Sequence, residues 1–246
     1  MPMNKYLFII LLFFSAFSVS ANSVIEGNNR EYAGKTIHFY CWSDAVTQKE
    51  EPLFSIRFDN EGRFRAEVQV SKTTFTFCDF GIYRGMFFIE PNQNVELLFP
   101  PLREKSFADE KNPFFEPVSF WFNLSNDRGI NQQISSFDTR LNQLTNQYFN
   151  QLYFRHSKAV FDTVTTILNT AFPASNNPGF EIHKKLKLKS LEAEAFRLKA
   201  EDIAGAFTEV KEEYQTHPAF VHFFDKVFAN RLSFDVKDIH GDELRK

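Results

Sequence analysis

The apolar residues of this chain change their spacing near residue 130, and this change constrains the fold more than any other feature. Before it, apolar and polar side chains alternate, as in the segments 36–42, 54–58 and 64–70. A period of two is typical of strands with one buried face. After residue 130, apolar side chains recur every three or four residues, which is the period of amphipathic helices. The sequence therefore predicts an α+β fold, in which an antiparallel β-sandwich of about seven strands precedes an all-helical module.

The turn at residues 59–62 is the clearest local signal in the first half. Its Asp, Asn and Gly are turn-forming residues, and the segments on both sides keep the same apolar period. We expect a β-hairpin here. Pro100 and Pro101 end the strand pattern.

These signals divide the chain into a β-sandwich domain at 22–102, an ordered crossover at 103–129 and a helical domain at 130–246. Within the helical domain, the pattern predicts helices over 130–152 and 160–171, and from about 180 toward 207. A further helix is expected from Pro218, which suits the first helical position.

Residues 1–21 are typical of a cleavable signal peptide. Lys5 precedes an apolar run that ends near Phe17, and small residues lead up to Ala21. The run is shorter than the ~20 residues that a membrane-spanning helix needs. We therefore expect cleavage after Ala21, a periplasmic or secreted protein, and no stable membrane span after signal cleavage.

The net charge and the motifs that the sequence lacks argue against several classes of function, beginning with nucleic-acid binding. The chain has 28 Lys and Arg against 31 Asp and Glu, a net charge of −3, so there is no electrostatic reason to expect nucleic acid as a partner. The sequence contains no Gly-x-Ser-x-Gly, no His-Glu-x-x-His and no glycine-rich phosphate loop. We predict no catalytic residue, no metal ligand and no cofactor.

Two groups of histidines and lysines have simple structural interpretations. His222 and Asp225 could share one helical turn, but two ligands do not make a metal site, so His217 is interpreted as a helix-start residue and His222 as a surface residue. The lysine-rich segment 183–189 is followed by acids and is interpreted as a solvated helix face.

Cys41 and Cys78 form a candidate disulfide, which an oxidising compartment would permit. Two separate buried thiols are an equal alternative, and a catalytic thiol is the least favoured one because no neighbouring residue would lower its pKa.

Four aromatic residues make a candidate binding surface. Tyr40 and Trp42 lie on the same face of a predicted strand, because they are two residues apart. Phe120 and Trp121 lie in the aromatic part of the crossover. Aromatic clusters of this kind are more often buried than exposed, because large apolar patches seldom stay on the surface.

Two segments carry a family resemblance: residues 58–64 (FDNEGRF) and 87–97 (FFIEPNQNVEL). With their order and spacing, residues 23–100 resemble the N-terminal β-sandwich that precedes the thioredoxin-like domain in secreted bacterial thiol-disulfide oxidoreductase-like proteins. The helical half resembles the helical region of such proteins. Asn92 stands where the family usually has Gly, and it tolerates the left-handed conformation of that turn. The thioredoxin-like domain with its Cys-x-x-Cys is absent, so no redox residue is carried over.

Two functions follow as hypotheses. The first is a non-catalytic exported protein that acts as a binding or interaction module for an unknown protein, peptide or glycan of the cell envelope. The alternative is the N-terminal accessory half of an exported thiol-disulfide oxidoreductase whose catalytic thioredoxin-like domain is missing from this chain. A hydrolase would need carboxylates or histidines that converge only in the fold.

Overall fold

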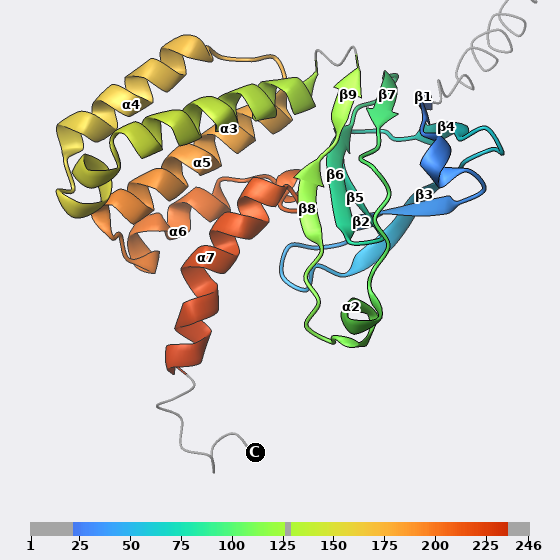
Figure 1. The fold of residues 1–246 in the computed structure, drawn as a ribbon. Coiled ribbons are helices and arrows are strands. Elements are labelled where there is room, and N and C mark those ends of the chain that lie inside the picture. Colours follow the sequence, from blue (N-terminus) through green and yellow to red (C-terminus); the bar gives the residue numbers. More distant parts are fainter. Residues whose placement is uncertain (1–21, 126–128, 236–246) are drawn as a thin grey trace, which may run out of the picture.

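A computed structural model describes residues 22–125 and 129–235, with side chains up to residue 228. The described part has nine strands in two sheets at its N-terminal side, followed by helices (Figure 1). The predicted α+β fold is therefore confirmed, including seven strands before residue 100. The predicted signal peptide lies outside the described residues.

The two sheets face each other as a sandwich. The first sheet has the order β4 (Arg63–Gln69), β1 (Asn22–Asn28), β7 (Asn94–Leu98) and β9 (Asn123–Ser125). The second has the order β3 (Glu50–Arg57), β2 (Thr36–Trp42), β5 (Thr74–Phe80), β6 (Tyr83–Ile89) and β8 (Val118–Trp121). A 3₁₀ turn η1 (Arg30–Tyr32) and the short helix α2 (Phe107–Lys111) lie between strands.

The predicted hairpin at residues 59–62 is wrong. The turn forms as expected, with Gly62 at a φ of 81° and the Asp59 carboxylate accepting the backbone N–H of Arg63. However, β3 pairs with β2 in one sheet and β4 pairs with β1 in the other. The turn thus carries the chain across the sandwich, and Phe58 and Phe64 meet in the core with ring centroids 4.8 Å apart. An alternating pattern fits both arrangements, because in each the two strands share one buried core.

The crossover adds an edge strand to each sheet. β8 pairs parallel to β6, and β9 pairs antiparallel to β7. Gly85 makes this docking possible, because a Cβ atom at this position would overlap the ring of Phe122. The predicted crossover is therefore part of the sandwich, and its Phe122 is buried between the sheets.

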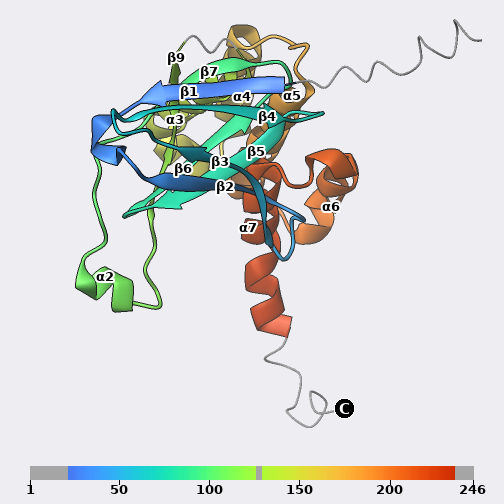
Figure 2. The same ribbon diagram turned by 90° about the vertical axis from the view of Figure 1, so that its right-hand side faces the viewer.

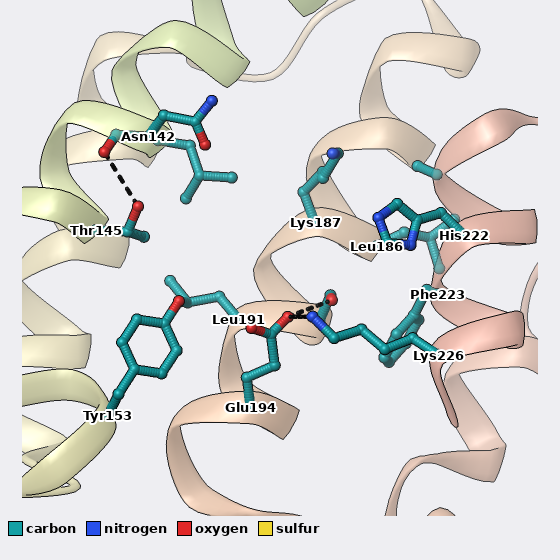
Figure 3. A pocket seen from close by; sticks show the side chains of 13 residues that line it. Asn142, Thr145, Tyr153, Leu186, Lys187, Leu191, Glu194, His222, Phe223 and Lys226 are labelled. Atoms are coloured by element: carbon teal, nitrogen blue, oxygen red, sulfur yellow. Dashed lines mark hydrogen bonds and ion pairs between the residues drawn. The ribbon is translucent and has the colours of Figure 1, made fainter. Parts of the chain in front are cut away.

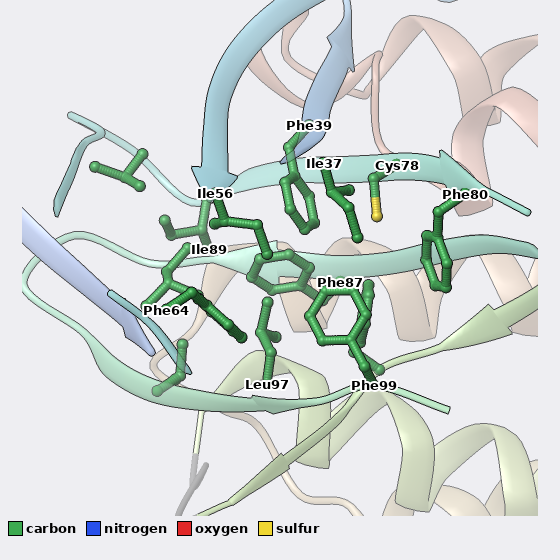
Figure 4. Close-up of a cluster of buried hydrophobic side chains, with 14 of the residues drawn as sticks. Ile37, Phe39, Ile56, Phe64, Cys78, Phe80, Phe87, Ile89, Leu97 and Phe99 are labelled. Carbon is green, nitrogen blue, oxygen red and sulfur yellow. The ribbon is translucent and has the colours of Figure 1, made fainter. Parts of the chain in front are cut away.

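Phenylalanine fills the space between the two sheets, which accounts for part of the 32 copies in the chain. Phe39 of β2 and Phe87 of β6 meet edge to face with ring centroids 5.9 Å apart, and Phe99, which directly follows β7, belongs to the same cluster (Figure 4). Phe99 and Phe122 meet edge to face at 4.9 Å between centroids, a geometry that aromatic pairs prefer.

The helical part contains α3 (Ile130–Gln147), the π-helix η2 (Asn150–Phe154), α4 (Lys158–Ala171), α5 (Pro178–Phe196), α6 (Ala200–Thr208), the 3₁₀ turn η3 (Glu212–Tyr214) and α7 (Pro218–Asp235). The single helix predicted from 180 toward 207 is wrong, because α5 ends at Phe196 and the next residue, Arg197, has a left-handed φ of 52°. Pro218 is the first residue of α7, as predicted. Within the described part, no helix combines the length and apolar character that a membrane crossing requires.

The helices cover the outer face of the second sheet. Phe75, Phe77 and Phe88 point away from the sandwich core and pack with the apolar faces of α3, α4 and α5. Trp42 contacts both this cluster and the one formed by α5, α6 and α7. The helices thus lie to one side of the sandwich in Figure 1, and α3, α4 and α5 lie behind it in Figure 2.

Candidate functional site

Two side chains fix the start of α3 against the sandwich. The Asn131 amide donates to the Phe88 carbonyl oxygen (2.8 Å) and accepts the Phe88 N–H (2.7 Å), so it continues the strand pairing where β8 ends. The Glu90 carboxylate accepts the backbone N–H of Ile130 (3.1 Å) and the side-chain amide of Asn177 (2.8 Å), the N-cap of α5. A carboxylate is favourable at a helix N-terminus, so Glu90 holds the starts of two helices against the end of β6.

A hollow of about 540 Å³ lies where α3 passes the edge strands β8 and β9. Its aromatic wall is Trp121, which is 40% exposed. The indole is stacked on Phe88, with ring centroids 5.8 Å apart and an interplanar angle of 17°, which fixes its orientation. The polar lining includes the side chains of Asn123, Gln132, Ser135, Asp138, Thr139 and Asn142.

A second hollow of about 190 Å³ opens between α3, η2, α5 and α7 (Figure 3). Leu141, Leu191 and Phe223 supply its apolar lining. Tyr153 and Asn142 line it together with the charged and polar residues Lys187, Ser190, Glu194, His222 and Lys226. Asn142 lines both hollows, so the two lie next to each other along α3.

The charged groups of the two hollows are paired within the protein. Asp138 Oδ1 is 2.7 Å from His183 Nε2, and Asp138 Oδ2 is 3.7 Å from Lys187 Nζ. Glu194 forms an ion pair with Lys226 and accepts a hydrogen bond from the Ser190 hydroxyl. The lining therefore presents both signs of charge in neighbouring pairs.

Two buried histidines lie beside this site. The side chains of His183 and His217 are 3% and 4% exposed, and their ring centroids are 5.5 Å apart. Burial lowers the pKa of His183, although the Asp138 carboxylate acts in the opposite direction. Burial also lowers the pKa of His217 well below its usual value, and the nearby His183 adds to the shift. Both rings are therefore neutral at pH 7.

The described residues contain no group of three or more His, Cys, Asp and Glu side chains arranged to hold a metal ion. His217 is buried at the start of α7, where its Nδ1 accepts the Ala219 N–H. His222 is exposed, as interpreted from the sequence, and Asp225 accepts a hydrogen bond from Gln48.

The four aromatic residues of the candidate binding surface do not lie together. Trp121 lines the first hollow, whereas Phe120 packs at the edge of the sandwich core. Tyr40 and Trp42 are half-buried and pack against the cluster beneath the helices. The four residues are therefore spread over several parts of the molecule, and Tyr40 and Trp42 line hollows other than the one beside Trp121.

The two cysteines are free thiols in the structure, so the candidate disulfide is not formed there. Cys78 is buried in the sandwich core, and Cys41 is half-buried. Burial raises the pKa of both thiols, which disfavours the reactive thiolate.

The sequence interpretation missed most of the polar lining. Asp138, Asn142 and Thr145 recur at helical spacing on α3, but the amphipathic pattern predicts only that such residues lie on the polar face of a helix. The segment 183–189 is not a fully solvated face, because His183 and Lys184 are buried. Lys184 Nζ donates to the Phe172 carbonyl oxygen and to Glu181.

Comparisons with known proteins give little beyond this geometry. No protein-family model matches the chain, and no curated protein matches it. Among solved structures, it is similar to a DUF3823 family protein from Parabacteroides merdae, with 9% identity and a TM-score of 0.22. The match covers 43% of this chain and 46% of that chain, less than half of each. A likeness at this level does not establish a shared fold or function.

Proposed function

We propose that this chain is a non-catalytic exported binding module that holds its ligand in the hollow beside Trp121. The observation that carries this proposal is a partly exposed indole held in place by stacking on Phe88, next to a row of polar side chains on α3. Binding sites commonly combine an apolar wall with a few fixed polar groups on rigid elements. The anchoring of α3 through Asn131 and Glu90 supplies this rigidity.

Binding explains the site better than catalysis does. Asp138 and His183 resemble part of a catalytic triad, but such a pair needs a nucleophile hydrogen-bonded to the second ring nitrogen. Within the described residues, Nδ1 of His183 has no hydrogen-bond partner. The remaining lining groups of the first hollow are mainly amides and hydroxyls, which bind ligands but do not exchange protons near pH 7.

The proposed setting is the cell envelope. A signal peptide over residues 1–21, cleaved after Ala21, would export the chain to the periplasm or the exterior. The ligand classes available there include proteins, peptides and glycans, and the net charge of −3 gives no reason to add nucleic acid to them.

Trp121 can report directly on ligand binding. The chain has two Trp residues, so Trp42→Phe leaves Trp121 as the single indole while keeping an aromatic ring against Phe75 and Phe77. We expect one class among uncharged oligosaccharides, charged oligosaccharides and peptides to shift the Trp121 emission. Trp121→Ala should then weaken that binding in calorimetry by at least about tenfold, because interface aromatic residues often contribute more than 1.4 kcal/mol. Binding of the same strength in Trp121→Ala, or no response to any class, would refute the proposal.

A second candidate is the accessory half of an exported thiol-disulfide oxidoreductase. Asn92 has a φ of 59°, the left-handed conformation expected where the thioredoxin-associated module has Gly. The order of a sandwich followed by helices also agrees with that resemblance. The non-reducing intact mass of the protein from its native envelope fraction tests this candidate. A mass equal to residues 22–246 would contradict it, and a much larger mass would support it.

A further inference from the structure

We infer that the two hollows along α3 form one extended site for an uncharged oligosaccharide. This inference rests on the proposed binding function and adds the chemical class and the length of the ligand. Three observations support it: the two hollows are adjacent along α3, the charges of their lining residues balance, and helices supply most of the lining elements.

The two hollows are adjacent along α3. Asn142 lines both, and the ion pair between Asp138 in the first hollow and Lys187 in the second joins them. From Asn131 to Thr145 the lining follows α3 for about 21 Å at the helical rise of ~1.5 Å per residue. A single sugar ring is much shorter than this, so a ligand that uses both hollows must be a chain of several units.

The charges of the extended site favour an uncharged ligand. Of the described Asp, Glu, Lys and Arg side chains that line the two hollows, each has a partner of opposite charge: Asp138 with Lys187, and Glu194 with Lys226. The combined charge of these four residues is zero. An anionic or cationic ligand would compete with one of these pairs for its charged group, which is unfavourable in a partly desolvated site.

The other lining groups fit hydroxyl-rich chains. The amides of Gln132 and Asn142 and the hydroxyl of Tyr153 can donate and accept hydrogen bonds, as sugar hydroxyls also do. The exposed face of Trp121 offers an apolar surface to the C–H face of a sugar ring.

A peptide fits the extended site less well. Extended peptides are held chiefly by main-chain hydrogen bonds to the open edge of a sheet. The second hollow is surrounded by helical elements, whose main-chain groups are already bonded within their own helices. Beside the first hollow, the open sheet edges are those of β8 and β9, which are only four and three residues long. Recognition along the whole site must therefore come mainly from side chains, which suits the hydroxyls of a glycan.

The test uses uncharged oligosaccharides of one to six hexose or pentose units, with acidic oligosaccharides and extended peptides as comparison ligands. Binding is measured by calorimetry and by the Trp121 emission of the Trp42→Phe protein. We expect affinity to rise by about tenfold between two units and the longest chain, as one or two added hydrogen bonds would provide.

Tyr153→Phe separates the two hollows, because it removes one hydroxyl from the second hollow and leaves the first unchanged. It should weaken binding of the long chains several-fold while leaving the disaccharide unaffected, and Trp121→Ala should weaken both. Tyr148→Phe is the matched control, since Tyr148 lies outside both linings and packs on the helical core.

The outcomes distinguish this inference from the proposed function. Affinity that does not depend on chain length, or that Tyr153→Phe leaves intact for long chains, refutes the extended site but not the binding function. Preferred binding of acidic oligosaccharides or peptides with a Trp121 response refutes the ligand class alone. No Trp121 response to any of the ligands refutes both.

Discussion

Glu90 is the single side chain on which the junction between the sandwich and the helices depends most directly. Its two carboxylate oxygens accept hydrogen bonds from the first residue of α3 and from the N-cap of α5. Glu90→Gln keeps the size and shape of the side chain but replaces one oxygen by an NH₂ group. The substitution therefore tests the hydrogen bonds and the charge separately from packing.

The expected loss follows from these two contacts. A Gln oxygen can still accept the Ile130 N–H, but its NH₂ then faces the NH₂ of Asn177. Asn177 cannot turn its own oxygen toward Gln without losing the bond to the Phe180 N–H that caps α5. A hydrogen bond to a charged group contributes about 1.5–3 kcal/mol. A carboxylate at a helix N-terminus contributes roughly 0.3–1 kcal/mol. Because Glu90 is only half-buried, we expect Glu90→Gln to lower the free energy of unfolding by about 2 kcal/mol.

Urea unfolding followed by both far-ultraviolet circular dichroism and tryptophan emission measures this loss. With a slope of about 2 kcal/mol per molar urea, the midpoint should fall by roughly 1 M. Glu67→Gln is the matched control, because Glu67 is an exposed strand residue of β4 and its substitution should change stability by less than about 0.5 kcal/mol. Equal midpoints for the two variants would show that Glu90 does not hold the helices on the sandwich.

Three further predictions concern separate parts of the chain. Burial depresses the pKa of His183 and His217, so the stability that these two rings contribute is complete above the unfolded pKa of about 6.5. Below that pH, the free energy of unfolding should fall by up to about 1.4 kcal/mol per histidine per pH unit. Unchanged urea midpoints between pH 7.5 and 5.5 would contradict this. Arg197→Gly should raise stability by about 0.5–1 kcal/mol, because Gly relieves the left-handed φ at the end of α5; a lower thermal midpoint would argue against that strain. In mass spectrometry after alkylation of the native protein, Cys41 should be modified before the more deeply buried Cys78, and the reverse order would contradict their burial.

The period of the apolar residues predicted the larger part of the fold. Alternation gave the seven strands before residue 100, and three-and-four spacing gave the main helices. Such patterns report which side of an element is buried, and the strands β1 to β7 and the helices α3 to α7 each have a buried side. They do not report which element lies opposite, so the same pattern predicts that β3 pairs with β4, although the two strands lie in different sheets.

The remaining errors have local causes that a single sequence hides. The end of α5 has no Gly or Pro at the left-handed position, which Arg197 occupies instead. The strands β8 and β9 are only four and three residues long, too short for a period to be read. Their place in the sheets depends on room left at Gly85, a feature of packing and not of local preference.

The candidate site was harder to predict than the fold because its residues come from elements that the sequence keeps apart. The sequence identifies Trp121 only as a member of an aromatic cluster, and its importance depends on Asp138 and Asn142, which line the same hollow from α3. On a helix, Asp and Asn on the polar face satisfy the same pattern whether they face bulk water or a hollow. These residues line a hollow, and do not simply face bulk water, because Glu90 and Asn131 fix α3 beside β8. The residues that place the helix therefore decide where a binding site can form, and a variant that loosens the Glu90 contact should weaken ligand binding at Trp121 as well as stability.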